Sequence, residues 1–333
     1  MESSRALLYC AGGGIGDSLV ASVVARALRA RFAVVDALTL PSHAEVLQRV
    51  PDVDDVMVDA GESERELGRR LSSGGYGACV VTWATPRTAR VAQLAAIPVR
   101  VGQARRIYSF RFTVRVVVRS EDGDVTSHWS DILLDYARAI GCDTADRAYR
   151  FVPTAGDEAQ ARALAGAAQR YVLLNPCNAV ASRRTWPVEG WAALARALRA
   201  RTGCRVFVSG SAADAGTVER VVARAADSEI VSIAGRTTIG EFGALARGAG
   251  LFVGITTGSM HVAAAVGCPT VGIFPFQSDY PDRWAPLGPR TAIVRASYPC
   301  HRGDTKERCR DYACIAHLDL ERIAATAESL LAC

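Results

Sequence analysis

The sequence predicts an α/β protein built from two doubly wound domains, each with a parallel sheet. Short apolar runs alternate with amphipathic helical patterns along the chain, as in βαβ units. The alternation pauses once, at "YRFVPTAG" (residues 149–156), and then restarts. A chain of 333 residues, half of them hydrophobic, can fill two such cores. We therefore expect an N-terminal domain over residues 1–153 and a C-terminal domain over 154–333, with the last helix able to pack on either.

In the first half, each expected strand is an apolar run rich in branched or aromatic residues, and each expected helix repeats apolar residues every three or four positions. The expected strands are "ALLYC", "FAVVDAL", "DDVMVD", "GACVVTW" and "TVRVVVRS". The expected helices cover residues 17–31, 43–49 and 63–71, followed by "HWSDILLDYARAIG", which ends at Gly141.

The second half repeats this rhythm. Its expected strands are "YVLLNP", "RVFVSG", "IVSIAG", "LFVGI" and "PTVGIF". Its expected helices are residues 157–169, "PVEGWAALARALRARTG", residues 214–226, "TIGEFGALARGAG", "GSMHVAAAVG" and the final "DLERIAATAESLLA".

Composition narrows the function classes. The net charge of +5 and the pI near 8.7 are mild, and they do not indicate a nucleic-acid partner. No signal-peptide pattern and no run of about 18 apolar residues occurs, so we expect a cytoplasmic protein with at most peripheral membrane association, at the inner face of the membrane. Most of the ten cysteines are scattered, as small buried residues are in a reducing compartment. Cys300, Cys309 and Cys314 are weak candidate metal ligands, because no CxxC pair accompanies them.

The stretch "LLYCAGGGIGDSLV" reads as a strand, a glycine turn and the start of a helix. A dinucleotide site would place glycine or alanine where this chain has Asp17, although Asp36, about 20 residues on, fits a ribose ligand. Asp17 can instead be a carboxylate in the first helical turn, stabilised by the helix dipole. The third interpretation is a general base beside an acceptor loop formed by Gly13, Gly14 and Gly16.

Three later loops follow strands, where ligands of doubly wound folds bind. "NPCNAVASRRTWP" offers Arg184, whose guanidinium suits a diphosphate. "TTGSMHV" offers a helix start with small residues and no carboxylate, which suits an anion. The candidate ligands of a donor diphosphate are Arg184, Thr257, Gly258, Ser259 and His261. The candidate contacts of a donor nucleoside or sugar are Asn178, Ser182, Ser211, Asp214 and Thr256.

Two further patterns concern charge. "DVD" at residues 52–54 and "DGD" at residues 122–124 match short acidic triplets that hold metals in some transferases, but we expect both to be solvated. The arginine-rich stretch "RVGQARRIYSFRFTVRVVVR" contains no acid, and Arg105 and Arg106 are candidate contacts of an anionic acceptor.

Taken together and in order, four pieces of the chain resemble the heptosyltransferases of glycosyltransferase family 9. They are "GGIGDSLVASVVARALRARF", "LLNPCNAVASRRTWPVEGWAALARAL", "TTGSMHVAAAVGCPTVGIF" with "RWAPLG", and the cysteine-bearing tail. The resemblance implies a GT-B fold, in which two Rossmann-like domains face each other across a cleft.

The same resemblance implies roles for particular residues. It makes Asp17 the catalytic base and Arg184 a contact of the donor phosphates. Thr257, Gly258 and His261 match the family's donor motif, whereas Thr256 stands where that motif has Asp.

The expected function is therefore inverting, metal-independent transfer of a heptose or related sugar from an ADP-sugar to the hydroxyl of a glycolipid or small molecule. A nucleotide sugar would be the co-substrate, with no other cofactor. The alternatives are a transferase that uses another nucleotide sugar for natural products, a noncatalytic nucleotide-sugar-binding relative and, more remotely, an NAD-dependent oxidoreductase.

Overall fold

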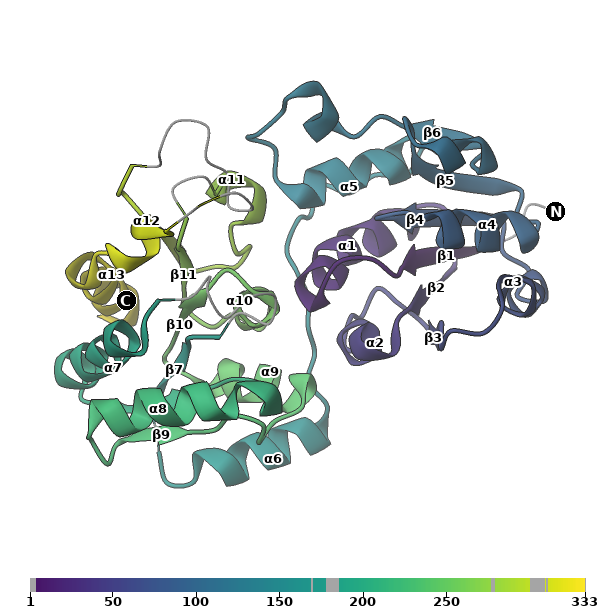
Figure 1. Cartoon of the computed structure of the whole chain (residues 1–333). Helices are drawn as coiled ribbons and strands as arrows, with labels where there is room; N and C mark the ends of the chain where they lie inside the picture. The colour runs from purple at the N-terminus through teal and green to yellow at the C-terminus, as the bar shows by residue number, and fades with distance from the viewer. Residues whose placement is uncertain are drawn as a thin grey trace. The chain divides into compact units, whose positions relative to one another are not determined.

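A computed structural model describes residues 4–168, 170–177, 186–276, 279–299, 309 and 311–332. The chain divides into two units, Met1–Val152 and Pro153–Cys333, each containing one sheet with helices packed on it (Figure 1). The prediction of an α/β fold with two parallel sheets is confirmed.

The first unit contains a six-stranded sheet in the order β3-β2-β1-β4-β5-β6, and all of its strand pairs are parallel. Its strands are β1 (Arg5–Cys10), β2 (Val34–Thr39), β3 (Val56–Val58), β4 (Ala78–Thr82), β5 (Val99–Gln103) and β6 (Val114–Val116). The chain reverses its direction of travel across the sheet between β1 and β4. Ligands of such sheets bind beyond the carboxyl ends of the strands at this point.

The second unit repeats this order. Its sheet runs β12-β11-β10-β7-β8-β9, again parallel throughout, and the direction of travel reverses between β7 and β10. Its strands are β7 (Tyr171–Asn175), β8 (Arg205–Val208), β9 (Ile230–Ser232), β10 (Leu251–Ile255), β11 (Thr270–Phe274) and β12 (Thr291–Arg295).

The helices of the first unit lie on both faces of its sheet, as right-handed crossovers require. On one face α1 packs against α2 and α5, and on the other α3 packs against α4. Their bounds are α1 (Ile15–Leu28), α2 (Pro41–Leu47), α3 (Glu64–Ser72), α4 (Pro86–Leu94) and α5 (Trp129–Arg138), with 3₁₀ turns η1 (Ile107–Arg111) and η2 (Arg119–Asp122).

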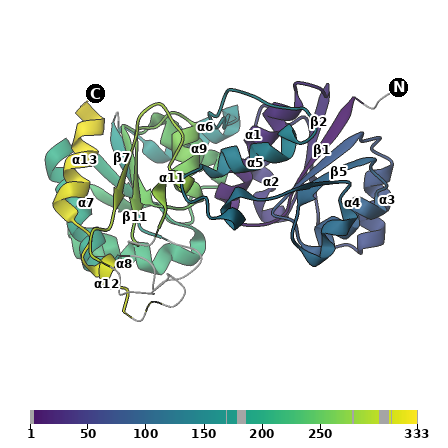
Figure 2. The same cartoon turned by 90° about the horizontal axis from the view of Figure 1, so that it is seen from above.

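The helices of the second unit follow the same plan. They are α6 (Ala155–Ala165), α7 (Val188–Thr202), the 3₁₀ turn η4 (Ala212–Asp214), α8 (Ala215–Ala225), α9 (Ile239–Gly248), α10 (Gly258–Ala265), α11 (Pro281–Trp284), α12 (Ala313–Ala316) and α13 (Leu320–Ala332). The last helix, α13, packs on α7 and on strands β10 to β12, so it covers the second unit's own sheet (Figure 2).

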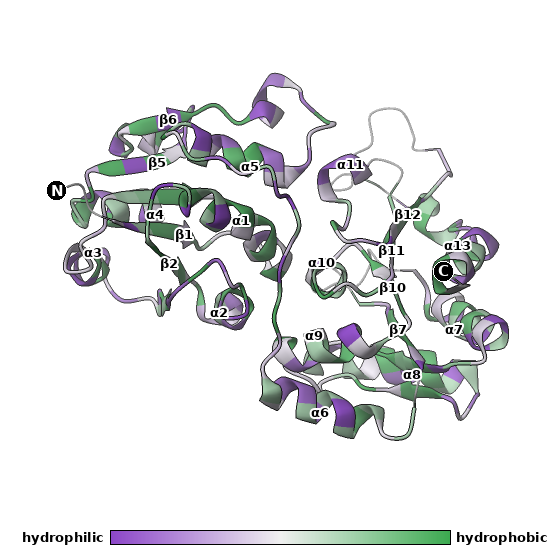
Figure 3. Cartoon of the chain, turned by 180° about the vertical axis from the view of Figure 1, so that it is seen from behind, coloured by the Kyte–Doolittle hydropathy of each residue, from purple (hydrophilic) through white to green (hydrophobic). Residues whose placement is uncertain are grey.

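Each core is formed where helix and sheet faces meet. β1 has the sequence "RALLYC" and is buried along its length except at Arg5, and α1 buries eleven of its residues. Figure 3 shows β1 and β2 as hydrophobic ribbons, whereas α6 carries hydrophilic residues among its hydrophobic ones. In the second core, Trp186 packs edge-to-face on Trp191 with ring centroids 5.7 Å apart, and Gly190 leaves the room for this contact.

Some elements differ from the sequence prediction. Helix α4 and the strands β5 and β12 lie in segments where the pattern did not indicate an element. The expected strand "TVRVVVRS" is only three residues long, because the chain turns into η2 at Arg119. The three missed or shortened strands are short and lie at or next to a sheet edge, where apolar and polar residues mix.

The expectation for the first acidic triplet is also wrong. Asp52 is only 13% exposed and forms an ion pair with the buried Arg26 at 3.0 Å, so it is a structural partner of α1 rather than a solvated acid. In the second triplet, Asp124 accepts hydrogen bonds from the backbone N–H groups of Thr126 and Ser127, as a turn residue does.

Candidate functional site

The glycine loop after β1 has its own carboxylate folded onto it. The carboxylate oxygen Oδ2 of Asp17 accepts a hydrogen bond of 2.5 Å from the backbone N–H of Gly14, the residue that caps α1. Gly13 has a φ of +75°, and a Cβ there would lie 2.6 Å from the Asp17 carboxyl carbon. Glycine is therefore required at this position, both for the turn and for the close approach of Asp17.

The surroundings of Asp17 shift its titration. Burial raises the pKa of this carboxyl above its ordinary value, while the Gly14 N–H and nearby His43 act in the opposite direction. His43 comes from α2 and is only 5% exposed, and burial lowers the pKa of its imidazole. Its Nδ1 lies 3.2 Å from the Ser18 hydroxyl, which is also buried. A carboxylate with a raised pKa is a stronger base, which suits proton abstraction near neutral pH.

Two tryptophans lie at the same edge of the first sheet. Trp83 directly follows β4, and its φ of +47° places it in the left-handed region that non-glycine residues seldom adopt. Its ring centroid lies 6.2 Å from that of Trp129, and both side chains are partly exposed. A Cβ at Gly12 would lie 2.7 Å from the Trp83 Cβ, so the glycine loop and Trp83 are in direct contact. Backbone strain of this kind gathers at functional sites.

Asp36 is engaged by its neighbours and is not positioned to bind a ribose. It is 2% exposed, and its carboxylate accepts hydrogen bonds from Arg5 at 2.6 Å and from the Tyr76 hydroxyl at 2.8 Å. This arrangement, together with the carboxylate on the glycine loop, disfavours a dinucleotide at the first unit.

In the second unit, the N-terminus of α10 follows β10 at the point where the strand order reverses. Thr257 caps α10 with an extended backbone, and its side chain makes no capping hydrogen bond. The Thr257 hydroxyl instead lies 2.8 Å from the Ser259 hydroxyl, and the first turn has no acidic residue. The first backbone amides of a helix bind anions when no carboxylate competes for them. His261, on the same turn, is 3% exposed.

The loop after β8 caps its own helix. One carboxylate oxygen of Asp214 accepts hydrogen bonds from the backbone N–H and the hydroxyl of Ser211, at 2.9 and 2.6 Å. The neighbouring Asn175 ends β7, where it donates to the Ser209 hydroxyl and accepts from the backbone N–H of Cys177. Sequence reasoning did not single out Asn175, His43 or Trp83, although a polar residue that ends a buried strand is a usable signal.

Several candidate residues cannot be placed. Asn178, Ser182, Arg184 and Cys300 lie outside the described residues. Among the residues that the structure describes, no group of three His, Cys, Asp or Glu side chains could hold a metal ion. The Cys309 sulfur accepts a hydrogen bond from the backbone N–H of Tyr312, and Cys314 is buried. The six scattered cysteines are free and buried, as predicted.

The two arginines expected to meet an anionic acceptor have acidic partners. Arg105 pairs with Asp122 and Arg106 with Glu121, each at 2.5 Å. These acids lie in and beside η2, which the short strand β6 brings alongside. The charge of both arginines is thus already partly balanced.

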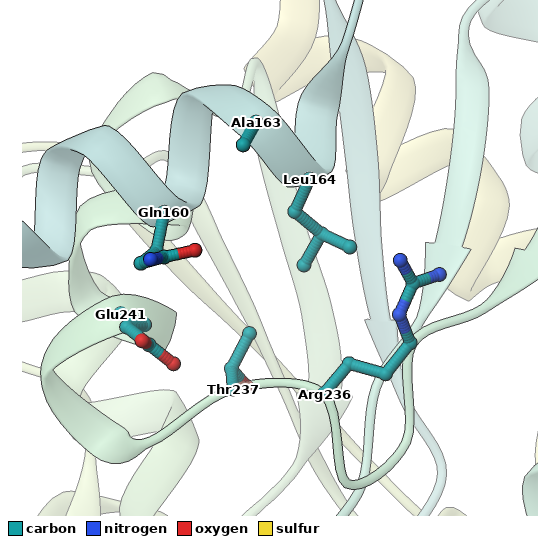
Figure 4. Close-up of a pocket in the computed structure, with 6 residues that line it drawn as sticks. All are labelled: Gln160, Ala163, Leu164, Arg236, Thr237 and Glu241. Atoms are coloured by element: carbon teal, nitrogen blue, oxygen red, sulfur yellow. The ribbon is translucent and has the colours of Figure 1, made fainter.

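A small pocket of about 190 Å³ lies between α6 and the start of α9 (Figure 4). Gln160, Leu164 and Arg236 are among the side chains that line it. None of the predicted site residues contributes to it, so we assign it no part in the site.

Comparisons with known proteins identify the relatives of this chain. The family model described as glycosyltransferase family 9 (heptosyltransferase) matches residues 64–312. Lipopolysaccharide heptosyltransferase 3 of Escherichia coli is 32% identical over 111 residues, which cover 33% of this chain and 32% of that protein. The match therefore spans about a third of the length of that relative.

Solved structures share the whole fold. ADP-heptose lipopolysaccharide heptosyltransferase II of E. coli matches with a TM-score of 0.81 at 20% identity, covering 98% of each chain. An E. coli heptosyltransferase solved with ADP matches with a TM-score of 0.70 at 18% identity, covering 88% of this chain and 93% of the other. At these identities the likeness establishes the GT-B-like fold. Within the described part of the chain, no helix has the length and hydropathy needed to cross a membrane.

Proposed function

The chain belongs to glycosyltransferase family 9, the heptosyltransferase family, and from this membership we propose that it transfers a heptose or related sugar from an ADP-sugar to an acceptor hydroxyl, with inversion. In this proposal the first unit holds the acceptor and supplies Asp17 as the general base. The second unit holds the donor through the N-terminus of α10 and Arg184. The reaction takes place in the cytoplasm, on a glycolipid or small-molecule acceptor.

One observation carries the assignment of the two roles. The N-terminus of α1 is occupied by a carboxylate of its own chain, because Asp17 accepts from Gly14. The N-terminus of α10 has no acidic residue in its first turn and no side-chain cap. A diphosphate would be repelled at the first helix and attracted at the second, by charge and by helix dipole alike.

The proposed reaction is a single displacement. Asp17 holds the Gly14 N–H with Oδ2, which leaves its other oxygen to accept the proton of the acceptor hydroxyl. The acceptor oxygen forms a bond to the anomeric carbon from the face opposite the diphosphate, and the bond between that carbon and the diphosphate oxygen breaks. ADP leaves with the electron pair, and the configuration at the anomeric carbon inverts.

The negative charge that develops on the departing diphosphate needs stabilisation. We assign this role to the backbone amides at the start of α10 and to Arg184, without a divalent cation. Arginine donates bidentate hydrogen bonds to phosphate oxygens and keeps its charge throughout. Truncating Arg184 to alanine should therefore weaken ADP binding by about 1.5–3 kcal/mol.

Thr256 gives the proposal a second branch. Where the family's donor motif has Asp, this chain has Thr256, whose backbone N–H is bound to the carbonyl of Ile273 and whose side chain is partly exposed. A threonine hydroxyl can still bond a sugar hydroxyl, but it lacks the charge of a carboxylate. The second candidate is therefore a transferase for a different nucleotide sugar, or a relative that binds the donor without transferring it.

The first experiment compares nucleotides. Thermal-shift measurements with ADP, UDP, GDP and NADH should show the largest rise in melting temperature with ADP, since a ligand at about 100 times its Kd stabilises by about 2.7 kcal/mol. A larger shift with UDP or GDP would select the different donor. A shift with NADH alone would overturn the proposal.

The second experiment tests the α10 site directly. Ser259→Asp places a carboxylate in the first turn of α10, as Asp17 does in α1, whereas Ser259→Asn adds similar bulk without charge. We expect ADP affinity measured by calorimetry to fall at least about tenfold in the aspartate variant, because like charges near a protein surface repel by a few kcal/mol at contact distance. The asparagine variant should stay within a few-fold of the parent. Equal effects of both substitutions would show that the site is not an anion site.

A further inference from the structure

A short 3₁₀ turn of the first unit holds two large apolar side chains in solvent. In η1, Ile107 is 97% exposed and Phe110 is 60% exposed. Scattered exposed apolar residues are ordinary, but two on one turn make a local patch. We call the exposed residues of this turn and its flanks, Arg105, Arg106, Ile107, Phe110 and Arg111, the η1 surface.

The exposure of these side chains comes from an anchored turn. Between the two apolar residues, Tyr108 points inward: its hydroxyl donates to the carbonyl of Ala84 and accepts from the Gln103 amide at 2.8 Å. The Ser109 hydroxyl donates to the Gln103 carbonyl at 2.8 Å, and Ser109 is 5% exposed. Because the inner side chains fix the turn, Ile107 and Phe110 are presented outward as a matter of geometry.

Positive charge surrounds the apolar pair. The Arg111 guanidinium lies 4.7 Å from the centroid of the Phe110 ring, where it gains a cation–π contact. Its hydrogen bond goes to Gln93, a neutral side chain, so its charge is not balanced by that partner. Arg105 and Arg106 remain about half exposed despite their ion pairs, at 50% and 44%.

A cavity of about 590 Å³ adjoins the turn. It is bounded by Pro86 and Arg90 of α4, by Glu64 of α3, and by Ile107, Tyr108 and Phe110 of η1. Apolar walls with arginine at the margin suit a molecule that has an apolar body and an anionic head.

We propose that the η1 surface docks on a membrane that contains anionic lipid. Ile107 and Phe110 enter the boundary between headgroups and acyl chains, while Arg105, Arg106 and Arg111 lie at the level of the lipid phosphates. Apolar insertion flanked by basic residues is the pattern of interfacial attachment. The net charge of +5 on the whole chain acts in the same direction.

The position of the surface adds a functional consequence. Tyr108 is bound to Ala84, and Ala84 follows Trp83, which contacts the glycine loop. A docked η1 surface would therefore hold the carboxyl edge of the first sheet close to the lipid. This inference goes beyond the transfer reaction and does not depend on it, because docking can be measured without any substrate.

The test is co-sedimentation of the full chain with vesicles. One set contains phosphatidylcholine and phosphatidylglycerol in equal parts, and the other contains phosphatidylcholine alone. We expect binding to the anionic vesicles that weakens as salt rises, and little binding to the neutral ones. Absence of binding to the anionic vesicles, or equal binding to both sets, would overturn the proposal.

Variants locate the surface. Ile107→Ser with Phe110→Ser should lower the vesicle partition coefficient at least about tenfold, because the apolar insertion is lost. Arg111→Gln should lower it several-fold on anionic vesicles only. Val152→Ser is the matched control, since Val152 is 54% exposed and lies outside the η1 surface, and it should bind as the parent does.

Two further readouts keep the result decisive. The exposure of Ile107 and Phe110 means that the double variant should keep the parent's melting temperature and circular dichroism spectrum. If sedimentation velocity shows a dimer that the double variant converts to a monomer, the surface is a contact between copies of the chain and the membrane proposal fails. Unchanged vesicle binding by the double variant would overturn it equally.

Discussion

The structure gives Asp17 two roles that two substitutions can separate. As a cap, Asp17 accepts the Gly14 N–H; as a base, it takes a proton. Asparagine keeps an oxygen that can accept from Gly14 but cannot take a proton under these conditions. Asp17→Asn should therefore lower the rate about a hundred- to ten-thousandfold, the usual cost of losing a general base, or about 3–5.5 kcal/mol in the barrier. Its melting temperature should stay close to that of the parent.

Asp17→Ala removes both roles. It should lose activity as the asparagine variant does, and it should also lose about 0.5–2 kcal/mol of stability with the cap. In a unit of this size, each kcal/mol lowers the melting temperature by about 2–4 °C.

The assay measures release of ADP from the ADP-sugar in the presence of acceptor, together with calorimetric ADP affinity. Both variants should bind ADP as the parent does. If Asp17→Asn keeps its rate within a few-fold while Asp17→Ala loses stability, Asp17 is a helix cap only and the reasoning fails.

Three other predictions follow from the same contacts. Because burial raises the pKa of Asp17 above 3.8 and the base must be deprotonated, the rate should fall as pH drops through that raised pKa, so the acid limb of kcat should lie above pH 3.8 in the parent and disappear in Asp17→Asn. Gly13→Ala forces a φ of +75° on alanine and displaces Asp17, so kcat should fall at least about tenfold with a stability loss of about 1–2 kcal/mol, and an unchanged kcat would contradict the role of the loop. Arg26→Ala leaves Asp52 without its ion-pair partner and the carbonyl of Ala148 without a donor, so urea unfolding should show a loss of about 3–5 kcal/mol; a loss below about 1 kcal/mol would mean that water replaces the guanidinium.

The sequence predicted the features that depend on local pattern. The succession of strand, glycines, carboxylate and helix is contiguous, so the position of Asp17 at the start of α1 followed from the chain alone. The amide-lined start of α10 was predicted for the same reason, since Thr257 to Ser259 follow a buried strand directly.

What the sequence could not predict depends on tertiary neighbours. His43 comes from α2 and Trp83 from the end of β4, and both reach the glycine loop only because β1 lies between β2 and β4 in the sheet. The ion pair of Asp52 with Arg26 depends on which face of α1 is turned inward. The acids that balance Arg105 and Arg106 lie 15 to 17 residues further along, and only the pairing of β5 with β6 brings them close.

The two units share one strand order, so the difference in their proposed roles must come from side chains at equivalent places. The third residue of α1 is Asp17, which is partly exposed and folds back onto the loop. The third residue of α10 is Met260, which is fully buried, and its sulfur fills the space over Gly272. A carboxylate at that position would be buried without a partner, at a cost of several kcal/mol. Core packing thus keeps negative charge out of the start of α10, and the same fold can present a base in one unit and an anion site in the other.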